Sequence, residues 1–302
     1  MQTNNTHPNV RTVNMPLQGK SQRGVTLIEL MVGIAIGLFV VAVAMGALMV
    51  SRGVSGSVSD ASSIQQQSAY VMRVIGLQLR QAGSLYLNLN PDSAPTALAN
   101  AVPVAFETVA PASGAGNSFD PTTNTLSATA TALTVGYRRY KEPVHYATTD
   151  QAIARNCVGG PTNGSDDQRV ESIFQLNGTE LRCQGNGAAA QPIAQNVANF
   201  QVRYLLQDNT LPGAPTIRYV AATDVGSTDW GRVQAVEVCL VLFGTEVIDM
   251  NGLSSTATSY TDCDGNTAVD MATLAGARAR RMHVVYRNVF QLRSQGLVGI
   301  AL

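Results

Sequence analysis

The sequence predicts an α+β protein in which one long N-terminal helix packs on a head built from an antiparallel β-sheet. Three observations predict this fold class. Residues 25–50 form a nearly unbroken apolar run, residues 64–82 carry apolar side chains at helical spacing, and strand-like segments follow from residue 132. The expected organisation is a leader at 1–24, a helix at 25–83 whose part 25–50 spans a membrane, and a β-rich head at 84–302.

The apolar run is long enough to cross a bilayer. About 20 apolar residues span the hydrocarbon core, and between Val25 and Val50 only the glycines, Thr26 and Glu29 are not apolar. The segment before the run holds three basic and no acidic residues, namely Arg11, Lys20 and Arg23. Because positive charge stays on the cytoplasmic side, we expect the N-terminus inside and the head outside.

A removable secretory signal is the alternative interpretation of this run. Ala42-Val43-Ala44 has the small residues of a signal-peptidase site. However, the apolar run continues to Val50, Glu29 interrupts it, and no turn-forming residue precedes the supposed cut. We therefore expect the segment to be retained.

The helix is expected to continue beyond the membrane as an amphipathic stripe. Its apolar positions recur at three- and four-residue steps, at Ile64, Val71, Val74, Ile75, Leu79 and Ala82. Polar side chains, among them Gln66, Arg73 and Arg80, occupy the other faces, and Gly83 is a natural helix end. The glycines at 53 and 56 leave open a hinge at 51–59 that would divide the helix in two.

Strand signals dominate the head. Alternation and β-branched residues predict strands at 132–140, 170–176, 179–183, 197–206, 217–222, 232–243 and 282–292, with a further possible strand at 102–109. Asn177-Gly178 between two of these segments predicts a hairpin. The core face of the sheet is expected to pack on the stripe of the long helix.

Composition argues against several functions. Charged residues make up 13% of the 302 residues, and the 20 basic residues balance the 20 acidic ones. Without the three leader bases the chain carries about −3, so the clustered positive charge of a nucleic-acid-binding protein is missing. The histidines, His7, His145 and His283, do not join a catalytic motif. We expect no enzyme activity, no cofactor and no direct nucleic-acid partner.

Four cysteines, Cys157, Cys183, Cys239 and Cys263, follow the apolar run, which places them in an oxidising compartment. They predict disulfides with three possible pairings. The sequential pairing closes two loops of roughly 25 residues, each worth about 3 kcal/mol in the chain-entropy model.

A metal site is not expected. No Cys-x-x-Cys or nearby histidine supports zinc. The acidic stretch 262–266 has a misplaced glycine and no closing glutamate for calcium, so a solvated acidic turn is the expectation there.

Arg23-Gly24, followed five residues later by Glu29 inside an apolar helix, resembles the processing signal of type IV prepilins and pseudopilins. The resemblance implies that a prepilin peptidase cuts after Gly24 and that Val25 becomes the new, N-methylated terminus, although the family usually has phenylalanine there. It also implies that Glu29 serves assembly by neutralising the Val25 amine of a neighbouring subunit. Whether the leader starts at Met1 or Met15 stays open.

Four stretches of the head, at 176–183, 191–204, 230–242 and 280–296, are similar to PilW-type minor pilins. The first is L-N-G-T-E-L-R-C, and the last is arginine-rich and contains Arg-Asn-Val. The resemblance implies a pilin-like fold and a disulfide-bounded loop near the C-terminus, in which Cys239 and Cys263 take part.

The same resemblance implies a role in starting type IV pilus assembly, at the tip if it carries an adhesin, with motility, adhesion or DNA uptake downstream. The partners would be the prepilin peptidase, other minor pilins, the major pilin and a tip adhesin. The location would be the bacterial inner membrane, with a periplasmic head, and then the pilus. Two alternatives stay open: a minor pseudopilin of a type II secretion system, and a signal-anchored periplasmic protein without an assembly role.

Overall fold

The computed structural model describes residues 24–86, 109–129, 132–208 and 214–292. The chain divides into two compact units, Met1–Arg52 and Gly53–Leu302. The possible strand at 102–109 and the leader before Gly24 lie almost wholly outside the described residues.

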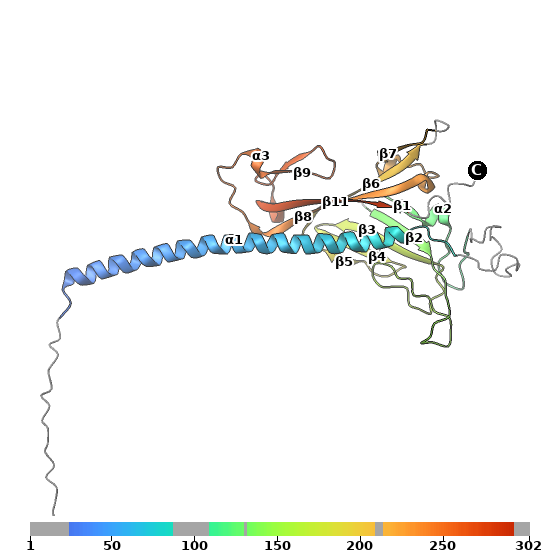
Figure 1. Cartoon of the computed structure of the whole chain (residues 1–302), viewed down its shortest axis with the longest axis horizontal. Coiled ribbons are helices and arrows are strands. Elements are labelled where there is room, and N and C mark those ends of the chain that lie inside the picture. Colours follow the sequence, from blue (N-terminus) through green and yellow to red (C-terminus); the bar gives the residue numbers. More distant parts are fainter. Residues whose placement is uncertain (1–23, 87–108, 130–131, 209–213, 293–302) are drawn as a thin grey trace, which may run out of the picture. The chain divides into compact units, whose positions relative to one another are not determined.

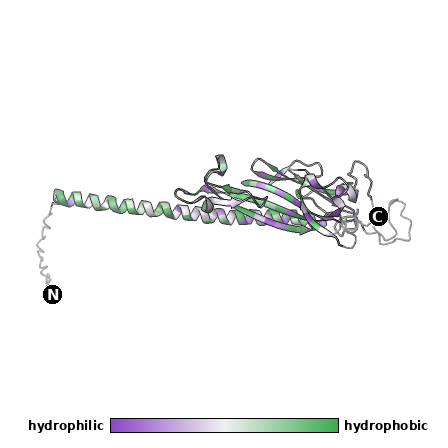
Figure 2. Cartoon of the chain, turned by 90° about the horizontal axis from the view of Figure 1, so that it is seen from above, coloured by the Kyte–Doolittle hydropathy of each residue, from purple (hydrophilic) through white to green (hydrophobic). Residues whose placement is uncertain are grey.

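Helix α1 runs from Leu27 to Gln81 and is helical throughout, including residues 51–59, where the sequence left a hinge open. It ends where Gly83 takes a left-handed conformation (φ 68°) that a side chain would disfavour. In the first unit its apolar side chains are exposed, and Figure 2 shows hydrophobic residues along this part of the helix. Among the described residues, α1 is the one helix long and apolar enough to span a membrane.

In the second unit, α1 buries the predicted stripe against the head. Ile64, Val71, Ile75, Leu79 and Ala82 are at most 2% exposed, because they lie on one face of the helix at the expected spacing. Val74, also predicted for the stripe, is only half-buried. Figure 1 shows this part of α1 running along the β-sheets of the head.

The strands form two main antiparallel sheets in place of the single sheet that the sequence predicted. The first has the order β1-β2-β3-β4-β5. Its strands are β1 (Leu126–Ala128), β2 (Ala132–Arg138), β3 (Arg169–Asn177), β4 (Glu180–Gly185) and β5 (Gln191–Ala194).

The second sheet has the order β11-β8-β6-β7, and a separate ribbon pairs β10 with β9. The strands are β6 (Val197–Asp208), β7 (Thr216–Val220), β8 (Val233–Val247), β9 (Ser259–Thr261), β10 (Ala268–Asp270) and β11 (Arg281–Gln291). Short helical turns fill the connections: α2 (Pro121–Asn124), η1 (Ala222–Asp224), η2 (Trp230–Arg232), α3 (Ser255–Thr258) and η3 (Gly276–Arg278).

The division between the sheets occurs at a backbone turn that the apolar pattern does not reveal. Strand β5 ends at Ala194 and β6 begins at Val197, with Asn196 between them at a positive φ of 56°. Asparagine tolerates this left-handed conformation, so the chain leaves the first sheet there and starts the second. The predicted hairpin is present between β3 and β4, with Gly178 (φ 60°) in the turn.

The main hydrophobic core is shared by α1 and both sheets. Ile75 and Leu79 from α1, Phe174 from β3, and Tyr204 and Leu240 from the second sheet belong to one buried cluster. A smaller cluster on the second sheet contains Cys239, Val241 and Cys263. The head therefore depends on the helix for part of its core.

All four cysteines are paired in the sequential pattern. Cys157 is bonded to Cys183, with Cα atoms 6.3 Å apart, and Cys239 to Cys263, with Cα atoms 5.7 Å apart. The first bond ties the long connection between β2 and β3 to β4, and the second ties the connection between β9 and β10 to β8.

Candidate functional site

The start of α1 is the first candidate site, and a local hydrogen-bond pattern shapes it. Thr26 precedes the first helical residue, and its backbone N–H and its hydroxyl donate to Oε2 of Glu29 at 3.1 and 3.0 Å. The Glu29 N–H donates back to the Thr26 hydroxyl oxygen at 3.4 Å. This reciprocal arrangement is a capping box, which satisfies donors that the first turn of a helix leaves free.

Thr26 belongs to this site through the capping box, although it was not predicted as a site residue. The signal was present, because threonine followed three residues later by glutamate is the capping-box spacing. Both Thr26 bonds fall on Oε2, and no donor among the described residues reaches Oε1 of Glu29. One carboxylate oxygen therefore stays open to a donor from outside the chain. Gly24 and Val25 lie next to it and are exposed.

The attachment of α1 to the head is a second candidate site, and Asp60 is its main polar contact. Asp60 is only 7% exposed. Its carboxylate accepts hydrogen bonds from the Thr245 hydroxyl at 2.8 Å and from the Glu246 N–H at 2.7 Å, both at the end of β8. Gly244 allows this approach, because a Cβ at that position would clash with the Asp60 carboxylate.

Further along α1, side-chain amides fix the helix to the first sheet. Gln78 accepts a hydrogen bond from the Ser172 hydroxyl of β3 at 3.0 Å and donates to the Arg155 carbonyl at 3.3 Å. Gln67 accepts from the Gln195 N–H at 3.1 Å. Both glutamines lie on a helix whose polar residues would be expected in solvent. The helix register against the head is thus set by polar as well as apolar contacts.

One tight packing contact joins α1 to the second sheet. A Cβ at Gly76 would lie 2.5 Å from Cε1 of Phe290 on β11. Phe290 is 7% exposed, so its ring has little room to move. Gly76 therefore lets the helix and β11 approach closely.

Arg139 is a buried charge whose role is structural. It is 1% exposed, and its guanidinium donates to the carbonyls of Thr162 and Ser165, each at 2.6 Å. Longer bonds to the carbonyls of Asn163 and Asp167, at 3.3 and 3.2 Å, complete the set. These contacts hold the irregular chain before β3 in place.

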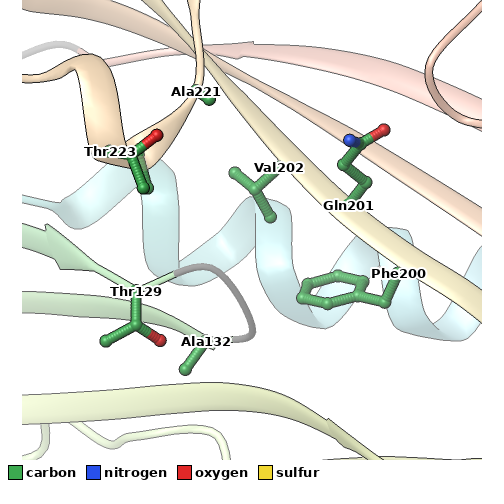
Figure 3. Close-up of a pocket in the computed structure, with 8 residues that line it drawn as sticks. Thr129, Ala132, Phe200, Gln201, Val202, Ala221 and Thr223 are labelled. Carbon is green, nitrogen blue, oxygen red and sulfur yellow. The ribbon is translucent and has the colours of Figure 1, made fainter.

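The cavities of the head differ in their lining, and one beside β2 is lined by the charged residues Arg138, Arg139, Lys141, Asp166 and Asp167. One cavity of about 180 Å³ lies between the two sheets, and Figure 3 shows it lined by Phe200, Val202, Thr223 and other uncharged residues. Among the described residues, no group of three or more His, Cys, Asp or Glu side chains could hold a metal ion. At the acidic turn, Asp264 accepts hydrogen bonds from the N–H groups of Asn266 and Thr267.

The described histidines also lie apart. His145 is exposed in a loop, whereas His283 on β11 is 7% exposed and stacks on Tyr260. His283 thus lies in a predicted strand, in an aromatic stack that periodicity alone does not indicate. Trp230 packs edge-on against Tyr204 at 5.0 Å, as a core anchor.

Comparisons with known proteins agree with both ends of the chain. The model of a prokaryotic N-terminal methylation motif matches residues 19–45. The model of the family described as Type IV Pilus-assembly protein W matches residues 162–294. None of the curated proteins compared with the chain matches it.

A type IV-like pilin from Thermus thermophilus is a structural neighbour with 12% identity and a TM-score of 0.32, over 76% of this chain and 96% of that one. The family assignment rests on the two sequence models together with the observed fold, a long apolar N-terminal helix with an antiparallel β-rich head. The chain is a membrane-anchored PilW-type minor pilin that takes part in type IV pilus assembly.

Proposed function

We propose that this minor pilin enters the pilus through a charge pair between Glu29 and the N-terminus of a neighbouring subunit. The observation that carries the proposal is the position of Glu29 in the apolar segment, with Oε2 held by Thr26 and Oε1 open. A charged side chain in a spanning segment costs about 3 kcal/mol on insertion scales. A cationic partner would remove much of this cost, so that the subunit is more stable next to a neighbouring subunit than alone in the membrane.

The cationic partner would be the free α-amine that cleavage after Gly24 creates at Val25. Before cleavage the same nitrogen is an uncharged amide, so the pair forms only after a prepilin peptidase has acted. The methylation-motif match over residues 19–45 supports processing at this position. Removal of the basic leader would then be the step that makes the subunit competent for assembly.

We further propose that the head acts outside the inner membrane, at the initiating or tip complex of the pilus, with other minor pilins, the major pilin and a tip adhesin as partners. The leader supports this orientation, because it precedes the span and carries basic residues but no acidic ones. The irregular connection of residues 139–168 adds surface to the head beyond its strands. The proposed role is binding and positioning, without catalysis.

The test is incorporation of Glu29 variants into filaments. Glu29→Gln keeps the shape and a carbonyl acceptor for Thr26 but removes the charge, whereas Glu29→Asp keeps the charge on a shorter stem. We expect Glu29→Gln to be processed and inserted in the membrane as wild type but to be depleted from sheared filaments, by immunoblot normalised to the membrane fraction. Glu29→Asp should retain part of the incorporation.

A matched control is Thr26→Val, which removes the hydroxyl bond but keeps the carboxylate. This variant should be incorporated far better than Glu29→Gln, because the charge that recruits the neighbour is intact. Incorporation of Glu29→Gln at the wild-type level would contradict the proposed charge pair.

A further inference from the structure

His283 joins the second sheet to the chain segment that covers it. Its ring stacks on Tyr260 of β9 with centroids 5.0 Å apart and an interplanar angle of 9°. The Phe243 ring of β8, the cross-strand partner of His283, lies 5.7 Å away at 26°. The imidazole thus contacts one aromatic ring of the sheet and one of the covering segment.

Both nitrogens of the His283 ring have assigned partners. Nδ1 lies 2.9 Å from the Arg281 carbonyl oxygen, which can only accept, so Nδ1 carries the proton. Arg278 Nε lies 3.4 Å from Nε2 and can only donate, so Nε2 is the acceptor. Arg278 also donates to the Tyr260 hydroxyl at 3.0 Å. The arrangement requires a neutral imidazole.

The covering segment is the connection 248–280 between β8 and β11. Near its ends the Ile248 N–H donates to the Arg280 carbonyl at 2.8 Å. In its middle, Arg287 of β11 donates to the Cys263 carbonyl at 3.1 Å, and Cys263 is bonded to Cys239 of β8. Asn199 of β6 also donates to Asp262 at 2.9 Å, and Tyr260 packs against the cluster of Cys239, Val241 and Cys263. Among these ties, the stack of Tyr260 on His283 is the one that includes a titratable ring of the sheet.

The charges around His283 oppose a second proton on the ring. Arg278 faces it from η3 and Arg281 lies two residues away on β11, whereas Asp262, just after β9, is the one acid among the described charged groups that act on it. Phe243 on β8 adds no charge. A proton on Nε2 would turn this nitrogen into a donor that faces the Arg278 Nε–H, and it would place the imidazolium next to the guanidinium.

We propose that His283 is an acid-sensitive latch: protonation of its ring releases segment 248–280 from the second sheet, while the Cys239–Cys263 disulfide keeps the segment tethered. Release would expose the face of the sheet beneath Tyr260 without unfolding the head. This inference does not depend on the Glu29 charge pair.

The direction of the pH dependence follows from the environment of the ring. Burial, and then the Arg278 charge, lower the pKa of His283, against the opposing effects of the Arg281 carbonyl and Asp262. In the released state the ring returns to an ordinary pKa of about 6.5. The closed state is therefore fully stable above about pH 6.5 and loses stability as the pH falls below it. Release should increase by up to about tenfold per pH unit until the pKa of the closed state is reached.

Hydrogen exchange of the full chain in detergent micelles tests the latch. Amide protection in β9 and β10, corrected for the intrinsic pH dependence of exchange, should fall between about pH 7 and pH 5, while protection in β3 and β4 should not. His283→Phe keeps a ring in the stack but does not titrate, so its β9 protection should be independent of pH. His145→Phe removes an exposed histidine and should behave as wild type.

A histidine NMR titration measures the pKa of His283 directly and separates the latch from a purely structural role of the ring. The His283 pKa should lie below the ordinary histidine value of about 6.5, and Arg278→Gln should raise it by removing the facing cation. The latch is refuted if wild-type β9 protection is unchanged between the two pH values or if His283→Phe loses protection as wild type does. It is also refuted if the His283 pKa lies at or above about 6.5.

Discussion

The Asp60 contact gives the sharpest prediction for how α1 is held on the head. Replacing Asp60 with asparagine keeps one acceptor oxygen, while the amide NH₂ faces either the Thr245 hydroxyl or the Glu246 N–H, both at hydrogen-bond distance from the native carboxylate. Replacing it with alanine removes both acceptors. The Glu246 N–H then loses its carboxylate partner at a site where Asp60 was only 7% exposed.

The magnitude follows from the hydrogen bonds. A bond to a charged group contributes about 1.5–3 kcal/mol, and a buried donor left without a partner costs about 1–3 kcal/mol. We therefore expect the free energy of unfolding to fall by about 2 kcal/mol in Asp60→Asn and by about 3–5 kcal/mol in Asp60→Ala. Hydrogen exchange should increase most in α1 near residue 60.

The assay is denaturant unfolding of the full chain in detergent, followed by tryptophan fluorescence. Trp230 is the single tryptophan of the chain and packs on the buried Tyr204 ring, so it reports on the core of the head. Asp150→Asn, at an exposed position, is the matched control and should change stability by less than about 0.5 kcal/mol. A change in Asp60→Ala no larger than that of the control would refute the reasoning.

Two other contacts yield predictions of the same kind. Gly76→Ala should lower the free energy of unfolding by about 1–3 kcal/mol, because the new methyl group meets the buried Phe290 ring. Gly53→Ala is the control: it has open space around it and should be neutral or stabilising by up to about 1 kcal/mol. Equal effects of the two substitutions would contradict the packing argument. Replacing both Cys239 and Cys263 with alanine should cost about 2–4 kcal/mol and lower amide protection in segment 248–280. The matching change at Cys157 and Cys183 should leave that segment protected, as peptide-level hydrogen exchange can show.

The parts of the fold that follow from simple periodicity could be predicted from the sequence. The apolar stripe from Ile64 to Ala82 has helical spacing and is buried as that spacing requires, apart from the half-buried Val74. The long strands β6, β8 and β11 lie close to their predicted positions, although β8 extends to Val247. Short strands such as β1 and β5 were missed, because three or four residues give no clear alternation.

Features that depend on tertiary contacts could not be predicted. Asp60 and Gln78 are polar residues on a helix, and such residues are usually exposed. Their burial depends on hydrogen bonds to β8 and β3, which the helix sequence does not reveal. The split into two sheets depends on the left-handed conformation of Asn196, and the presence of an asparagine does not by itself specify that conformation. In the candidate site, Glu29 was identified from its charge in an apolar run, whereas the role of Thr26 became clear only from the hydrogen bonds between them.

Mass spectrometry of the N-terminus in purified filaments tests whether the amine required by the Glu29 charge pair exists in the pilus. We predict that the chain in sheared filaments begins at Val25, so that a free amine exists to pair with the Glu29 of a neighbour. Filaments that contain the chain with residues 1–24 still attached, or beginning after Ala44 and so without Glu29, would contradict it.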